Sequence, residues 1–250
     1  MKSNFFSTDI SKYIYEKPSY KSKVSSEILY GEKFKILSKN NKWLKIKTSF
    51  DNYTGYIKNV NFINKFKPTH KIYKLKSRIF KGSRNKKIHK TNYFLSFSSN
   101  ISKIGEWKNF IEYEHNKWIK KKDIKKIDHI EKSYLKIFKT FLKTKYIWGG
   151  KSYKGMDCSA LLQLYFYYNK KFYPRDTRDQ IKFSKKITQR KKFKKGDIIF
   201  WEGHVAICIN SDQLIHAYGP KKKVIKMPIN LTIITIKKTA NLIIKKISSI

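Results

Sequence analysis

The spacing of apolar residues changes near residue 131, and this change constrains the fold more than any other feature of the sequence. Before it, short apolar runs alternate with polar residues between Gly, Asn and Ser, as in Trp43-Leu-Lys-Ile-Lys-Thr48 after the Asn40-Asn41 turn signal. After it, apolar residues recur at helical spacing over residues 134–142. We therefore expect an all-β part followed by a part that begins with helices.

The later part combines helices with strands. Residues 159–169 are apolar nearly all round, which indicates a buried helix, and residues 177–185 are also expected to be helical. Strand-like runs follow over residues 197–201, 204–209, 213–217 and 223–227. Helices first and antiparallel strands afterwards are typical of the α+β class. A chain of 250 residues has room for two small β-barrels at 1–68 and 69–128 and an α+β domain at 129–250.

A segment with three glycines, residues 149–155, leads into the sequence Asp157-Cys158-Ser159, and the apolar helical run begins immediately afterwards. This order places Cys158 in the first turn of a helix. Unpaired N–H groups and the positive end of the helix dipole lower the pKa of a thiol at that position. Cys158 is thus a candidate nucleophile, and the alternative is a small buried core cysteine.

Two histidines on neighbouring predicted strands are candidates for the rest of a catalytic group. His204 begins a strand after Gly203, and His216 lies on the next strand, beyond a hairpin near residues 210–213. A strand aims a histidine rigidly, as a general base requires, and an adjacent ring would fix its tautomer. The alternatives are a structural hydrogen bond for His204 and a buried, partnered histidine at position 216.

Zinc binding is the competing interpretation of these residues. Cys158, His204, Cys208 and His216 offer nitrogen and sulfur ligands, but their spacing fits no compact zinc motif. Cys208 lies roughly 13 Å along a strand from His204, and we assign it to the core. The sequence therefore predicts no metal site, no organic cofactor and no disulfide framework.

The formal net charge of +41 raises the hypothesis of a protein that binds nucleic acid or another anionic surface. Only five of the 58 basic residues are arginines, however, and arginine is the preferred residue for forked phosphate and base contacts. The lysines are spread over the whole chain together with Ile, Asn, Tyr and Phe, which share A/T-rich codons. We attribute the charge to compositional drift and predict no specific nucleic-acid partner.

The expected location follows from two features. No stretch of 18 apolar residues predicts a membrane helix. The segment Met1–Ile10 has no apolar core of signal-peptide length and reaches Asp9 early. We expect a cytoplasmic protein with no membrane partner, and the sequence leaves the oligomeric state undetermined.

The ordered motifs of residues 130–235 resemble those of the NlpC/P60 cysteine peptidases. The motifs are Tyr146-Ile-Trp-Gly-Gly, Asp157-Cys158-Ser159-Ala-Leu, Gly196-Asp197-Ile-Ile-Phe-Trp, Gly203-His204-Val-Ala-Ile and Ile215-His216-Ala. Residues 10–65 resemble a bacterial SH3 (SH3b) domain through Tyr30-Gly-Glu32, Trp43-Leu-Lys-Ile and Tyr53-Thr-Gly-Tyr-Ile. Together they are similar to γ-D-glutamyl-L-diamino acid endopeptidases of the dipeptidyl-peptidase VI type.

The resemblance implies a papain-like catalytic domain preceded by SH3b-type β-barrels. It assigns Cys158 as the nucleophile, His204 as the base and His216 as the residue that orients the base. It also implies substrate binding by Tyr146, Asp157, Ser159, Asp176, Tyr53 and Glu32. Asp157 has an alternative role as a helix cap. Ala160 departs from the family's usual glycine after Cys-Ser.

The implied reaction is hydrolysis of the bond between γ-D-Glu and a diamino acid, Lys or diaminopimelate, in muropeptides with a free N-terminal L-Ala. It would release L-Ala-D-Glu during cell wall recycling. One alternative is a papain-like amidase or acyltransferase, which would tolerate a blocked amino terminus. Another is a non-catalytic basic protein for anionic polymers, which would bind in a salt-sensitive way and show no thiol reactivity. The sequence leaves the preferred diamino acid open.

Overall fold

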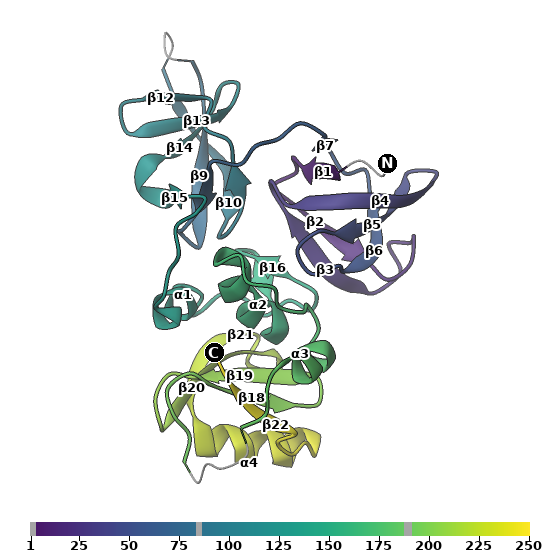
Figure 1. Cartoon of the computed structure of the whole chain (residues 1–250), viewed down its shortest axis with the longest axis vertical. Coiled ribbons are helices and arrows are strands. Elements are labelled where there is room, and N and C mark those ends of the chain that lie inside the picture. The colour runs from purple at the N-terminus through teal and green to yellow at the C-terminus, as the bar shows by residue number, and fades with distance from the viewer. Residues whose placement is uncertain (1–3, 84–86, 188–191) are drawn as a thin grey trace. The chain divides into compact units, whose positions relative to one another are not determined.

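The computed structural model describes residues 4–83, 87–187 and 192–250 (Figure 1). The chain divides into two compact units, residues 1–130 and 131–250. The first unit is built from strands, whereas the second combines helices with strands. The α+β fold class predicted from the change in apolar spacing is therefore confirmed.

The first unit begins with a seven-stranded antiparallel sheet in the order β3-β2-β6-β5-β4-β1-β7. Its strands are β1 (Asn4–Ser7), β2 (Ser11–Tyr15), β3 (Val24–Leu29), β4 (Lys33–Asn40), β5 (Trp43–Thr48), β6 (Thr54–Lys58) and β7 (Phe62–Ile63). Successive side chains of a strand point to opposite faces of the sheet, and this determines which side chains of β5 enter the core. Leu44 and Ile46 are buried with Ile14 and Phe34, while Lys45 is only half-buried.

The rest of the first unit forms a five-stranded sheet, β10-β9-β14-β13-β12, and a three-stranded sheet, β11-β8-β15. The elements are β8 (His70–Ile72), β9 (Lys76–Lys81), β10 (His89–Ser96), β11 (Asn100–Ile101), β12 (Gly105–Trp107), β13 (Phe110–Glu114), β14 (Lys117–Lys120), a 3₁₀ turn (Lys121–Asp123) and β15 (Ile124–Lys126). Ile72, Leu95 and Ile119 share a core cluster with Tyr30 from the preceding segment. The two sets of strands are thus packed together by apolar contacts.

The second unit is built around a five-stranded antiparallel sheet in the order β21-β20-β19-β18-β22. Its elements are α1 (Tyr134–Thr140), β16 (Lys151–Ser152), β17 (Gly155–Met156), α2 (Cys158–Tyr168), α3 (Thr177–Phe183), β18 (Asp197–Trp201), β19 (His204–Cys208), β20 (Gln213–Tyr218), a 3₁₀ turn (Gly219–Lys221), β21 (Lys223–Pro228), α4 (Ile229–Ala240) and β22 (Lys246–Ser249).

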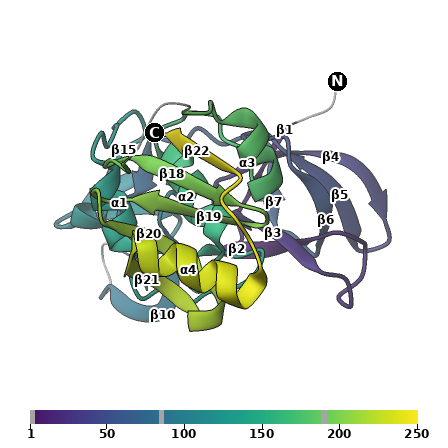
Figure 2. The same cartoon turned by 90° about the horizontal axis from the view of Figure 1, so that it is seen from below.

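Helices cover both faces of this sheet. Figure 2 shows α4 lying across the sheet, where Ile236 packs with Ala206 and Leu214. The helix α2 contacts β19 and β20, and its Leu161 lies with Val205 on the other side. Burial on both faces explains why every residue of β18 is buried, in contrast to the alternating pattern of β5.

The structure adds elements that the sequence reasoning did not predict, α4 and β22. The helix α4 is rich in Ile and Thr, which favour strands, so its composition hides its helical period. Its buried positions, Ile229, Thr232 and Ile236, have the helical spacing. No helix among the described residues has the length and apolar character that a membrane crossing requires.

Candidate active site

Cys158 is the first residue of α2, as the glycine-rich approach predicted. Asp157 precedes it as the N-cap, and its Oδ1 accepts a hydrogen bond from the backbone N–H of Ala160 at 2.8 Å. The approach requires glycine, because a Cβ atom on Gly150 would lie 2.5 Å from the carbonyl oxygen of Gly155. Glycine thus allows the two backbone segments that precede α2 to lie in close contact.

The sulfur of Cys158 is buried, with the residue only 5% exposed. Sγ lies 3.9 Å from Oγ1 of Thr177 and 3.8 Å from the carbonyl oxygen of Gly203. The backbone N–H of Val205 also interacts with it. In the described part of the chain, the polar contacts of the sulfur are thus with Thr177 and with the backbone on both sides of His204, rather than with the histidine ring.

The pKa of Cys158 differs from the expectation. Burial, followed by the charge of Asp157, raises the pKa of the thiol to about 11, even though hydrogen bonds from Val205 and Thr177 oppose the shift. The expectation of a lowered pKa is wrong, because the loss of hydration outweighs the hydrogen bonds to the sulfur and the positive charge of Arg175. The thiol is therefore protonated near neutral pH, and nucleophilic attack requires a base.

The two predicted histidines lie side by side. Nε2 of His204 is 2.9 Å from Nδ1 of His216, which reaches it from the neighbouring strand β20. Burial lowers the pKa of His204 to about 4, and burial together with the nearby His204 lowers the pKa of His216 to about 3. Both rings are therefore neutral at neutral pH, as a base and its orienting partner must be.

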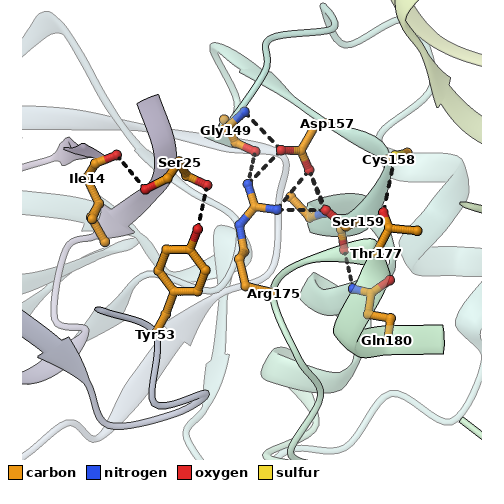
Figure 3. A network of polar contacts seen from close by, with 12 residues as sticks. Ile14, Ser25, Tyr53, Gly149, Asp157, Cys158, Ser159, Arg175, Thr177 and Gln180 are labelled. Atoms are coloured by element: carbon orange, nitrogen blue, oxygen red, sulfur yellow. Dashed lines mark hydrogen bonds and ion pairs between the residues drawn. The ribbon is translucent and has the colours of Figure 1, made fainter. Parts of the chain in front are cut away.

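A buried ion pair supports the start of α2. Nη1 and Nη2 of Arg175 donate to the two carboxylate oxygens of Asp157 at 2.9 and 2.7 Å (Figure 3). Nη1 also donates to Oγ of Ser159 at 2.8 Å. The side chains of Arg175 and Asp157 are only 1% and 10% exposed. This forked geometry is the kind that arginine provides and lysine does not.

Further donors complete the environment of Asp157. The backbone N–H of Gly149 donates to Oδ2 at 2.9 Å, and the hydroxyl of Ser159 donates to Oδ1 at 3.1 Å. Together with the cap to Ala160, these bonds make Asp157 the residue that joins the glycine-rich approach to α2. The structure therefore shows the capping role that was the alternative to substrate binding.

Sequence reasoning missed Arg175. The signal that pointed to it was composition, since Arg175 is one of only five arginines among 58 basic residues. At this position the site uses two parallel donors of one side chain, which arginine provides and lysine does not. Thr177 and Gln180 were missed as well. The side-chain amide of Gln180 donates to the carbonyl of Ser159 at 3.0 Å and so ties α3 to α2.

The other residues predicted from the second unit lie around the same helix. Burial raises the pKa of Tyr146 well above its usual value, with the charges of Cys158 and Asp157 adding to the shift, so its hydroxyl stays protonated. Ser159 is bound to Arg175, as described above. Asp176 is the N-cap of α3 and directly follows Arg175.

Tyr53 and Glu32 belong to the first unit and have partners within it. The hydroxyl of Tyr53 donates to the carbonyl of Ser25 at 3.3 Å (Figure 3). Glu32 is 1% exposed, and its Oε2 accepts from the backbone N–H of Leu29 at 3.0 Å. The bond to Leu29 stabilises the turn in which Glu32 lies. A role in substrate binding stays a prediction for both Tyr53 and Glu32.

A metal centre has no structural support in the described residues, since no three His, Cys, Asp or Glu side chains among them are arranged to hold an ion. Cys208 is buried in the core next to Trp201 and Leu214, as assigned from the sequence. Proton transfer between a thiol and a histidine ring is ordinary acid–base chemistry.

Comparisons with known proteins agree with this architecture and confirm the family resemblance. Residues 143–241 match the NlpC/P60 family, and residues 11–62 match the bacterial SH3 domain. Dipeptidyl-peptidase 6 from Lysinibacillus sphaericus is 36% identical over 78 residues, which are 31% of this chain and 29% of that protein. Gamma-D-glutamyl-L-lysine dipeptidyl-peptidase from Bacillus subtilis (strain 168) is 24% identical over 217 residues, 78% of this chain and 72% of that protein.

Among solved structures, an NlpC/P60 family protein from Bacillus cereus ATCC 10987 aligns with a TM-score of 0.78. The alignment covers 91% of this chain and 95% of that protein at 18% identity, a level at which the likeness establishes the fold. The chain spans less than two thirds of the Lysinibacillus protein, since the match covers 29% of its length. Both of these curated relatives, from Lysinibacillus sphaericus and Bacillus subtilis, are named as dipeptidyl-peptidases.

Proposed function

We propose that this chain, which contains an NlpC/P60 domain and a bacterial SH3 domain, is a cysteine peptidase that acts on peptidoglycan-derived peptides. The observation that carries the proposal is the position of Cys158 at the N-terminus of α2, against the backbone that flanks His204, while His204 contacts His216. A buried thiol next to a base that is held by a third group is the arrangement needed for nucleophilic catalysis.

The reaction begins with attack of the Cys158 sulfur on the scissile carbonyl carbon. The thiol proton passes to neutral His204 as the S–C bond forms, because the thiol is protonated at neutral pH. The first N–H groups of α2 have no partner within the helix, so the N–H of Cys158 can stabilise the oxyanion. The protonated hydroxyl of Tyr146 is a second donor for the oxyanion or the substrate.

Collapse of the tetrahedral intermediate breaks the C–N bond, and the imidazolium of His204 gives its proton to the leaving amine. A water molecule then attacks the thioester. His204 takes a proton from this water and returns it to the sulfur as the acid product leaves. The enzyme ends in its starting protonation state, and no redox or metal step is required.

For the substrate we propose the γ-D-glutamyl–diamino acid bond of peptides with a free N-terminal L-Ala, so that L-Ala-D-Glu is released. The name of the Bacillus subtilis relative, which aligns with 78% of this chain, supports this class. An ammonium group in a partly desolvated pocket needs a carboxylate partner. We assign that role to Asp176, the carboxylate that directly follows Arg175 and caps α3.

A substrate with a free amino end is a peptide already released from the glycan strand. We therefore propose that the chain works in recycling such peptides in the cytoplasm. The preferred diamino acid, Lys or diaminopimelate, is left to the assay below.

The test is incubation with L-Ala-γ-D-Glu-diaminopimelate, its Lys analogue and the N-acetylated form of each, with products identified by mass spectrometry. We expect release of L-Ala-D-Glu from the free peptides and its loss in the variant Cys158→Ala. Cys208→Ala is the matched control, because Cys208 is a core residue of the same domain and should leave the activity in place.

Two results would contradict the proposal. Activity retained by Cys158→Ala would remove the nucleophile assignment. Equal cleavage of free and N-acetylated peptides would leave a cysteine peptidase but remove the free-amine requirement, as expected for a general amidase or acyltransferase.

A further inference from the structure

A third side chain continues the contact between the two histidines. Nε2 of His216 lies 3.3 Å from the sulfur of Met227, on the side of the ring opposite the 2.9 Å contact to His204. The register explains this contact. His216 pairs with Ile225 of β21, and Met227 is two residues further along, so it projects from the same face as a diagonal neighbour.

The chemistry of the thioether fixes the direction of both hydrogen bonds. A methionine sulfur has lone pairs but no hydrogen, so it can only accept. Nε2 of His216 must therefore carry the proton in this contact. A neutral imidazole has one N–H, and burial holds the pKa of His216 at about 3, so its Nδ1 carries no proton at neutral pH.

The same reasoning extends to His204. Because Nδ1 of His216 is an acceptor, Nε2 of His204 must be the donor in their 2.9 Å contact. The pKa of His204 is lowered to about 4, so this ring also carries one proton, and its Nδ1 holds a free lone pair. A base that takes a thiol proton needs a ring nitrogen in that state.

We propose that Met227 is a positioning residue, whose sulfur accepts a hydrogen bond from Nε2–H of His216 and thereby keeps Nδ1 of His204 unprotonated. This inference rests on the proposed function for its catalytic meaning, although the proton order itself does not. His216 is 0% exposed, so bulk solvent cannot replace the sulfur as acceptor. The ring of His216 is further held by stacking on Tyr218, with centroids 4.7 Å apart and an angle of 11°.

The test reads the tautomers directly, from the ring ¹⁵N chemical shifts of the full-length protein, which has six histidines. In the wild-type protein we expect Nε2 to be protonated and Nδ1 unprotonated in both His204 and His216. Met227→Leu keeps the side-chain volume but removes the acceptor. We expect it to shift the tautomer ratio of both rings by about threefold to tenfold and to lower kcat by a similar factor.

Two further variants separate hydrogen bonding from packing. Met227→Gln offers a carbonyl oxygen as acceptor and should restore the wild-type tautomers and most of kcat. Ile225→Val changes apolar packing opposite His216 without changing any acceptor, and it should leave the ¹⁵N shifts unaltered.

The inference is overturned if Met227→Leu leaves the ¹⁵N shifts unchanged, if Met227→Gln fails to restore them, or if Ile225→Val changes them as much as Met227→Leu. It is also overturned if the wild-type His216 is protonated at Nδ1. These ¹⁵N measurements use no substrate. If the protein were inactive on the tripeptides, the proposed function would be refuted, and the ¹⁵N shifts would still decide the role of Met227.

Discussion

Replacing Arg175 with methionine should destabilise the second unit, because it would leave the carboxylate of Asp157 buried without its opposite charge. The change removes two hydrogen bonds to Asp157, one to Ser159 and one to the carbonyl of Gly150 at 3.4 Å. Removing one partner of a buried ion pair costs about 3–5 kcal/mol of stability. Asp157 keeps its donors from Gly149, Ser159 and Ala160, so we expect a loss near the lower end, about 3 kcal/mol.

The assay uses the cysteines as reporters of one unit. Both cysteines are buried and lie in residues 131–250, so in a Cys158→Ala background the thiol of Cys208 becomes reactive when this unit opens. Labelling of Cys208 as a function of urea concentration then gives the free energy of unfolding of the second unit, where the transition is two-state. Arg178→Met is the matched control, because Arg178 is 83% exposed and its contact with Asp179 is 3.9 Å long. Its effect should stay below about 0.5 kcal/mol.

A double-mutant cycle with Asp157→Asn isolates the charge pairing from the packing of the arginine stem. In the Asp157→Asn background, Arg175→Met should cost at least about 1.5 kcal/mol less than in the parent protein. The reasoning is refuted if Arg175→Met costs no more than Arg178→Met, or if its cost is the same in both backgrounds. The first result would mean that the pair contributes nothing, and the second that Arg175 acts only by packing.

The remaining predictions concern acid sensitivity and the glycine-rich approach. The pKa of His216 lies near 6.5 in the unfolded chain and about 3 in the fold, so its contribution to stability is complete above pH 6.5 and is lost as the pH falls toward 3. Between pH 7 and pH 5 the free energy of unfolding should fall by about 2 kcal/mol because of His216. The variant His216→Asn should lose about 2 kcal/mol less than the wild-type protein over this interval. Stability curves that run parallel for the two proteins would exclude the effect. Gly150→Ala should cost about 1–3 kcal/mol in the Cys208 labelling assay, because its Cβ would meet the backbone of Gly155. At Gly219 a Cβ would make an ordinary 3.5 Å contact, so Gly219→Ala should cost less than about 0.5 kcal/mol, and equal costs would refute the steric argument.

The position of Cys158 shows what local pattern can predict. The three glycines of residues 149–155, the capping Asp157 and the apolar run that follows are all contained in a short segment, and the helix begins where they indicate. The contact between His204 and His216 also followed from a local feature, the hairpin that places their strands side by side. Local composition misled at α4, where Ile and Thr obscured the helical period, and the strand β22 was also not predicted.

The pKa of the thiol shows what pattern cannot predict. The helix N-terminus argued for a lowered pKa, but burial of the sulfur among packed elements raises it. Burial is a property of the assembled unit, since Thr177 and Gly203 reach Cys158 from other parts of the chain. The same holds for the neutral state of both histidines, which results from their burial within the second unit.

The sequence by itself determined the change from strands to helices near residue 131 and the start of α2 at Cys158, because apolar spacing, caps and glycines act over a few residues. Only the tertiary structure decided which charged groups form ion pairs and which groups share a hydrogen bond. Arg175 reaches Asp157 across 18 positions of sequence, and Met227 reaches His216 across 11. Such pairings depend on how elements pack, and in a buried environment they set the charge of each group, so the chemistry of the site is a property of the folded unit.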